Sequence, residues 1–209
     1  LGKVVPENAD ASALENVVIA RCVVNLFLRE DTDSGQIQNF VLRNNIILFL
    51  VSARPINTSA LPISNLIVAN NIIAGSVSSI SLDSGGPHQF YNNIIRSERN
   101  AFFANSQVSN NIFYNNTLGA CLDPATGSSG YENTDFMNNI FHQTDFDSYD
   151  FSTDTNGNTG SGNIDADPQF VDFPVTGIVD ERGDLQAFDF HLDTGSPGIG
   201  AGTDGSNIG

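Results

Sequence analysis

A short polar sequence motif between apolar residues recurs along the chain. Five copies read Asn-Asn-Ile followed by a second large apolar residue. They begin at Asn44, Asn70, Asn92, Asn110 and Asn138. Weaker copies flank them at Glu15-Asn16-Val17-Val18 and at Gly162-Asn163-Ile164. Between the second Asn of successive copies the gaps range from 18 to 29 residues. A repeat of this length that tolerates insertions is typical of a solenoid, in which each repeat forms one coil.

The apolar positions on either side of the Asn pair alternate with period two. The residue two places before the pair is always large and apolar, and the residue two places after the first Asn is always Ile. This pattern predicts two short strands joined by a tight bend, with the Ile on the inward face of its strand. Asn suits the bend because it adopts left-handed backbone angles at low cost.

Equivalent Asn residues of successive coils would lie above one another, so that their side-chain amides could bond to each other. Such a ladder satisfies polar groups that cost about 1–3 kcal/mol each when buried without a partner. The expected ladder consists of Asn45, Asn71, Asn93, Asn111 and Asn139. The fold class predicted is therefore all-β, a right-handed parallel β-helix (β-solenoid) of about seven coils with an internal Asn ladder.

The chain is expected to form one β-helix domain over residues 1–209. Residues 1–16 would form an N-terminal cap, residues 17–165 the coils, and residues 166–209 a C-terminal closing segment. Loops of unequal length between the copies of the motif account for the unequal gaps. A solenoid tolerates such loops because each coil contacts only its neighbours.

The two cysteines, Cys22 and Cys121, are about four repeats apart. Rungs stacked at about 4.8 Å would separate them well beyond the roughly 7 Å between Cα atoms that a disulfide allows. We therefore expect two free, mostly buried thiols.

Charge limits the partners of the protein. Acidic residues outnumber basic ones 24 to 8, which gives a formal net charge of −16. Such a surface repels nucleic acid and anionic membranes, and it would repel a polyanionic glycan unless a cation or a local basic patch intervened. The chain has no run of 18 apolar residues that would predict a membrane span. Its richness in Asn, Ser, Thr and Gly, with a single Lys, suits an extracellular or cell-surface protein.

After Asn163 the pattern changes. Three segments read Asp-Pro-x-Phe-Val-Asp, Asp-Phe-His-Leu and Gly-Ser-Pro-x-Ile-x-Ala-Gly, at residues 167–172, 189–192 and 195–202. Together with the repeats, this end resembles right-handed parallel β-helix proteins of the pectate-lyase-like superfamily, notably bacterial secreted and surface proteins. The resemblance implies the fold more strongly than the function, because this superfamily holds lyases, hydrolases, epimerases, phage spikes and non-catalytic surface proteins.

The resemblance also implies what an enzyme of this kind would need. Lyases of the superfamily use a Lys or Arg base on a strand face, often with bound calcium, and its hydrolases carry paired acids on adjacent coils. The only lysine, Lys3, lies outside the repeats, and the chain has neither an Asp-Asp pair nor a Gly-His-Gly turn. The nearest substitute brings together acid, imidazole and guanidinium groups. These enzymatic candidates are Asp83, His88, Arg96 and Arg99. The alternative is an ordinary turn in which the histidine makes its hydrogen bonds within the fold.

Metal and modification signals are fragmentary. Three scattered histidines and two distant cysteines do not make a zinc site. Two stretches resemble parts of calcium loops but lack the bidentate acid at the end. The weak calcium candidates are Asp31, Asp33 and Asp154. Asn57 and Asn115 match the N-glycosylation pattern, which matters only in a eukaryotic secretory host.

These observations predict an extracellular structural or cell-surface β-solenoid. Because the first coil of a solenoid exposes unpaired strand edges, copies could associate head-to-tail into filaments. The alternatives are a carbohydrate-active enzyme, either a polysaccharide lyase or a glycoside hydrolase, and a polysaccharide-binding module. The expected partners are accordingly a second copy of the chain or a polysaccharide.

Overall fold

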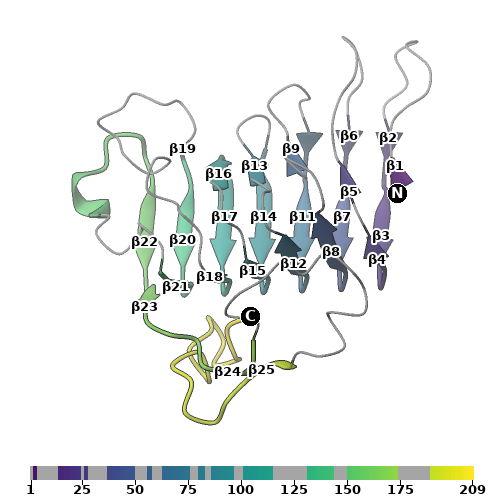
Figure 1. Cartoon of the computed structure of the whole chain (residues 1–209). Helices are drawn as coiled ribbons and strands as arrows, with labels where there is room; N and C mark the ends of the chain where they lie inside the picture. The colour runs from purple at the N-terminus through teal and green to yellow at the C-terminus, as the bar shows by residue number, and fades with distance from the viewer. Residues whose placement is uncertain are drawn as a thin grey trace.

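The structure, a computed structural model, shows an all-β chain wound into stacked coils (Figure 1). It describes residues 2–3, 14–24, 26–27, 37–49, 56–57, 63–75, 80–82, 86–96, 101–114, 131–143, 150–173 and 189–209. The one helix in these residues is the 3₁₀ segment η3 (Phe151–Thr153). None of the described helical structure is long and apolar enough to cross a membrane.

Two long parallel sheets run along the stack. The first sheet contains β3 (Val18–Ala20), β7 (Val41–Arg43), β11 (Ile67–Ala69), β14 (His88–Tyr91), β17 (Ser106–Ser109), β20 (Asp135–Met137) and β22 (Thr159–Ser161). The second sheet contains β4 (Val23–Val24), β8 (Ile46–Phe49), β12 (Ile72–Gly75), β15 (Ile94–Arg96), β18 (Ile112–Tyr114), β21 (Ile140–His142) and β23 (Ile164–Asp165). Each strand pairs with its counterparts in neighbouring coils, so Ile72 lies opposite both Ile46 and Ile94. The predicted parallel β-solenoid is confirmed.

Shorter sheets complete the coils. A third sheet holds β9 (Ile56–Asn57), β13 (Ile80–Leu82), β16 (Ala101–Ala104) and β19 (Tyr131–Glu132). Two small parallel sheets hold β2 (Leu14–Glu15), β6 (Ile37–Gln38) and β10 (Ile63–Ser64), and β1 (Gly2–Lys3) with β5 (Leu26–Phe27). The prediction of about seven coils is wrong: the third sheet has only four described strands, so the described residues form about three complete turns of the solenoid.

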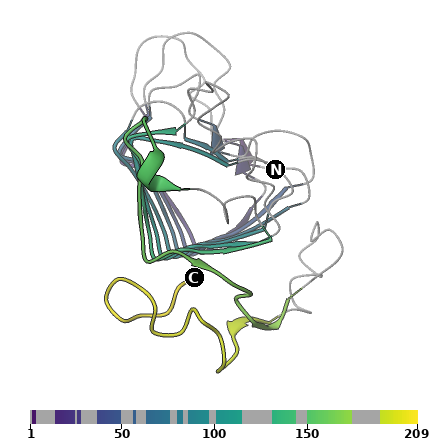
Figure 2. The same cartoon turned by 90° about the vertical axis from the view of Figure 1, so that its left-hand side faces the viewer.

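The three sides of the coil enclose an interior seen in cross-section in Figure 2, and large apolar side chains fill it. The first sheet contributes Leu42, Val68, Phe90, Val108 and Phe136, and the second contributes Ile47, Ile73, Ile95, Phe113 and Phe141, all at most 3% exposed. Phenylalanine rings contact each other between coils, as in Phe113–Phe141, with centroids 5.0 Å apart. The apolar residue two places before each Asn pair therefore points inward, as predicted.

The Asn pair turns the chain from the first sheet into the second. The first Asn of each strong copy has a left-handed φ between 51° and 56°, which Asn tolerates better than most residues. The second Asn points inward: Asn45, Asn71, Asn93, Asn111 and Asn139 are at most 1% exposed.

The side-chain amides of these residues form the predicted ladder. Asn71 Nδ2 donates to Asn93 Oδ1 at 2.9 Å and to Leu42 O at 3.1 Å. Asn93 Oδ1 also accepts the backbone N–H of Asn71, at 3.0 Å. The same pattern continues to Asn163, which accepts from Asn139. Each interior amide thus links the coil before it to the coil after it, and its donors and acceptor are satisfied within the core.

The Ile that follows the Asn pair in each motif does not face inward, contrary to the prediction. Because its neighbour, the ladder Asn, points into the core, the alternation of a strand turns the Ile outward. Ile94, Ile112 and Ile140 are nevertheless at most 9% exposed, since the C-terminal segment packs over them. An outward row covered by a later part of the chain has the same local sequence pattern as a core row.

The weak first copy of the motif, at residues 15–18, does not hold the first ladder position. The register aligns Val23 with Ile46, so Cys22 holds the ladder position and Arg21, with φ 59°, forms the bend. Cys22 is a free thiol, as predicted, but it is exposed rather than buried because it lies on the first rung. Its backbone N–H still donates to Asn45 Oδ1 at 3.1 Å. Cys121 lies outside the described residues.

Candidate functional site

The expected enzymatic constellation is only partly described. Asp83 and Arg99 lie outside the described residues, as do Asp31, Asp33 and Asn115. Arg96 ends β15 of the second sheet, whereas His88 begins β14 of the first. His88 has no exposed surface and lies opposite Ser106 in the next coil. The structure therefore places His88 in the interior, where a polymer outside the solenoid cannot reach it.

His88 belongs to a second buried column. Its position is filled by apolar residues in the early coils, Phe40 and Leu66, and by polar residues in the later ones: Ser106, Thr134 and Asn158. Thr134 N–H donates to Asn158 Oδ1 at 3.2 Å, and the Thr134 hydroxyl donates to Phe103 O at 3.1 Å. These contacts make the column a second structural ladder.

Asp154, the described calcium candidate, ends this column. Its Oδ1 accepts the backbone N–H groups of Asn156 and Asn158 at 2.7 and 3.0 Å. Its Oδ2 accepts from Asn158 Nδ2 at 3.0 Å. In this structure the carboxylate organises a loop, and no group of three metal-ligating side chains occurs within the described ranges. Calcium binding at Asp154 therefore stays a prediction.

A second left-handed bend precedes the column. The Asn-Asn-Ile motif alone does not predict it. The bend residues are Asn16, Asn39, Asn65, Asn105, Asn133 and Gly157. Their exposed amides also bond along the stack: Asn65 Nδ2 donates to Asn39 Oδ1 at 2.9 Å, and Asn39 Nδ2 to Asn16 Oδ1 at 3.1 Å. The signal that identifies this bend is an Asn six residues before ladder positions 22, 45, 71, 111 and 139.

The segment that carries the family resemblance forms a clamp on the second sheet. We use clamp for β24 (Phe170–Asp172), β25 (Asp189–Leu192), which pairs with it in antiparallel fashion, and residues 193–209. The buried Ile208 packs on the outward Ile row. Thr203 and Asn110 exchange two hydrogen bonds, at 2.8 and 3.1 Å, and Gly209 N–H donates to Asn110 O at 3.0 Å. These sequence motifs therefore have a structural role, which is to fold the chain end onto the stack.

The outer face of the first, seven-stranded sheet is a regular surface formed by described residues. It forms the left side of the cross-section in Figure 2, whereas the clamp lies against the second sheet. Two outward rows run along it. One reads Val18, Val41, Ile67, Gln89, Gln107, Asp135 and Thr159, and the other Ala20, Arg43, Ala69, Tyr91, Ser109, Met137 and Ser161. The first row is thus apolar from Val18 to Ile67 and polar from Gln89 onward, whereas the second row is mixed, with Arg43 near the N-terminal end and Met137 beyond Tyr91.

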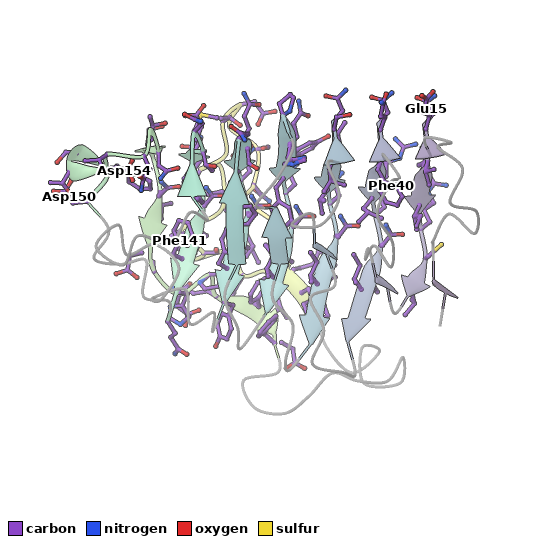
Figure 3. The ribbon with its side chains drawn as sticks, turned by 90° about the horizontal axis from the view of Figure 1, so that it is seen from above. Glu15, Phe40, Phe141, Asp150 and Asp154 are labelled. Carbon is purple, nitrogen blue, oxygen red and sulfur yellow. The ribbon has the colours of Figure 1, made fainter. Side chains whose placement is uncertain are left out.

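The two ends of the stack differ. At the C-terminal end η3 lies beyond β22, with Asp150 and Asp154 beside it, and Glu15 marks the opposite end (Figure 3). The Asp150 carboxylate accepts from the Ser152 hydroxyl at 2.6 Å and from Ser152 N–H at 2.9 Å, and these bonds lower the pKa of Asp150. The Phe151 ring packs on Phe136 at 5.8 Å and occupies the space where a side chain at Gly160 would lie.

No family model matches the chain, and comparisons with curated proteins and with solved structures also give no match. The described fold is a parallel β-solenoid. Membership of the pectate-lyase-like superfamily stays a prediction that rests on the sequence motifs of the clamp.

Proposed function

We propose that the protein is a structural β-solenoid that works outside the cell or at a cell surface, as a rigid spacer and not as a catalyst. The observation that supports this most directly is the unbroken ladder from Asn45 to Asn163. Every coil is tied to its neighbours by backbone pairing, by buried amides and by stacked apolar residues. Such an arrangement resists bending and local opening, because opening one coil leaves buried polar groups without partners.

Two measurements test this function. Limited proteolysis should leave the stack intact under conditions that digest ordinary globular domains. In parallel, the protein is incubated with a panel of neutral and acidic glycans, and unsaturated and reducing ends are assayed. Glycan turnover that disappears in Arg96→Ala would overturn the structural proposal in favour of a carbohydrate-active enzyme.

Polysaccharide binding is the second candidate function, and the polar part of the first sheet's outer face favours it. Gln89 and Gln107 are exposed and lie opposite each other on neighbouring strands, with Tyr91 in the adjacent row. Amides spaced by one rung can bond to successive sugar hydroxyls, and an aromatic ring can stack on a sugar face. The net charge of −16 favours an uncharged glycan.

Affinity electrophoresis against neutral glycans tests this second function. Retardation of the wild type should be lost in Tyr91→Ala and in the double variant Gln89→Ala/Gln107→Ala. The matched control is Val41→Ala, which changes the apolar part of the same row. Equal retardation of all variants, or none of the wild type, would exclude glycan binding at this face.

A further inference from the structure

The loop between η3 and β22 contains the single Asn-Gly pair of the sequence, Asn156-Gly157. The loop follows Asp154, which is labelled in Figure 3. Asn is a thermolabile residue, and the chain holds its side-chain carbonyl carbon close to the backbone nitrogen of the next residue. A following glycine hinders attack by that nitrogen least, because it has no Cβ. Both residues of the pair are exposed to solvent.

The fold explains why glycine stands at position 157. Gly157 takes the place of an Asn in the second left-handed bend and has a φ of 80°. A Cβ at this position would lie 2.9 Å from Asn133 Oδ1, which is closer than a real Cβ approaches another atom. The bend therefore requires glycine. The same lack of a Cβ leaves the Gly157 nitrogen open to the side chain of Asn156.

The groups that would react are not engaged elsewhere. Neither the side-chain amide of Asn156 nor the N–H of Gly157 has a hydrogen-bond partner in the described part of the chain. The nearby Asn158 and Asn163 differ, because their Nδ2 atoms donate to Asp154 Oδ2 and to Phe136 O, each at 3.0 Å. The Asn156 amide and the Gly157 nitrogen can therefore meet without first giving up a hydrogen bond of their own.

The single Asp-Gly pair of the sequence, Asp204-Gly205, shows the opposite arrangement. Gly205 N–H donates to Gly202 O at 3.0 Å, and Asp204 Oδ1 accepts from Ser206 N–H at 3.0 Å. Hydrogen bonds from the Ser206 hydroxyl and from its backbone N–H lower the pKa of Asp204. The carboxylate is thus ionised at neutral pH, and an anion resists attack by a nitrogen atom. Local structure therefore separates the two pairs, although each places a glycine after a short acid or amide.

We propose that Asn156 is a self-modification site, at which the Gly157 nitrogen attacks the side-chain carbonyl carbon and closes a succinimide ring. The new bond joins Gly157 N to Asn156 Cγ, and the bond from Cγ to Nδ2 breaks. The proton of the Gly157 N–H passes to solvent, and Nδ2 leaves as ammonia after taking a proton from water. Water then opens the ring at either carbonyl, which gives aspartate or isoaspartate. The net reaction consumes water and releases ammonia, without any oxidant or reductant.

The modification would weaken the contact between this loop and the coil before it. Asn156 O accepts Asn133 N–H at 3.0 Å, and Asn156 N–H donates to Asp154 Oδ1 at 2.7 Å. In isoaspartate the main chain runs through Cβ and Cγ, so the carbonyl that Asn133 uses becomes a carboxylate outside the main chain. The inserted methylene shifts Gly157 out of its bend, and the new negative charge lies two residues from Asp154. This inference does not depend on what the protein does.

Peptide mapping by mass spectrometry, after incubation of the whole protein in mildly alkaline buffer, tests the modification. Asn156 should lose its amide faster than any other Asn, and faster at higher pH, because proton removal activates the Gly157 nitrogen. The products should include isoaspartate. Asn163 and Asp204 supply the internal controls, and both should stay unmodified. Equal conversion of Asn156 and Asn163 would overturn the proposal, as would aspartate without isoaspartate, which indicates direct hydrolysis.

Hydrogen exchange at the Asn133 amide tests the structural effect. Exchange should accelerate at least about tenfold in the aged wild type, because this N–H loses its acceptor. Asn156→Gln keeps a neutral amide but would have to close a larger ring, so ageing should leave its mass and its exchange unchanged. Asn156→Asp adds the charge without altering the main chain and should accelerate exchange less than isoaspartate does. Unchanged exchange in the modified wild type would refute the weakening.

Discussion

Removing one amide from the middle of the ladder should cost much more than removing one at its end. In Asn93→Ala, the backbone N–H of Asn71 loses its acceptor, and Asn71 Nδ2 loses one of its two acceptors. Both donors are buried, and each buried group without a partner costs about 1–3 kcal/mol. The expected loss in the free energy of unfolding is therefore about 2–6 kcal/mol for the two groups. Small domains are stable by about 5–15 kcal/mol, so this is a large fraction.

The matched comparison is Asn163→Ala, which removes the same two bonds from Asn139 at the last rung. Asn163 is only partly buried, so water can replace the lost acceptor and the loss should be less than half that of Asn93→Ala. A second control is Asn92→Gly. It keeps the left-handed bend, as Gly162 does naturally, and the buried Oδ1 of Asn92 has no hydrogen-bond partner, so stability should be unchanged or higher.

Equilibrium unfolding in urea, followed by circular dichroism, measures these losses. Because long repeat arrays need not unfold in one step, hydrogen exchange at the Asn71 amide supplies a local reading. Exchange at this amide should accelerate strongly in Asn93→Ala and remain slow in Asn92→Gly. Equal losses for Asn93→Ala and Asn163→Ala would refute the argument that buried amides hold the coils together.

Three further predictions concern the surfaces and the end of the stack. Ile112→Ala should lower the free energy of unfolding in urea by about 2–5 kcal/mol, as in a core, because the clamp buries this outward residue. Ile46→Ala should cost clearly less, because Ile46 is only partly buried. Phe151→Ala should lower the free energy of unfolding in urea by about 2 kcal/mol, because the ring packs on Phe136 and fills the space beside Gly160. Ser152→Ala removes the hydroxyl that contributes most to the lowered pKa of Asp150, so a carboxyl NMR titration should give a value closer to the ordinary one. The stabilisation that this cap provides is present at neutral pH and is lost as pH falls through the folded-state pKa, and the variant should show a smaller acid-dependent loss.

The repeat was sufficient to predict the bend and the ladder of the five strong copies. Asn-Asn between alternating apolar residues predicted the bend and the ladder, because left-handed backbone and inward amides are local requirements. The sequence also carries a signal for the second bend, which is an Asn six residues before most ladder positions. It was missed because the apolar pattern around it is less regular: its buried neighbour is Phe40 in one coil and Thr134 in another.

Long-range packing explains what local pattern could not predict. Ile112 was assigned to the core because it is apolar and invariant among the copies, yet it points outward and is buried by Ile208, which lies far along the chain. His88 was a catalytic candidate, and only the register of the coils places it inside the stack.

Sequence periodicity by itself therefore determined the solenoid, its bends and its amide ladder, since these depend on residues within one coil and on the identity of the next. The tertiary structure alone decided which outward row is buried and where η3 packs against the stack. Those properties arise where the periodic chain meets non-periodic segments, the clamp and η3. A local pattern carries no information about which distant segment will cover it.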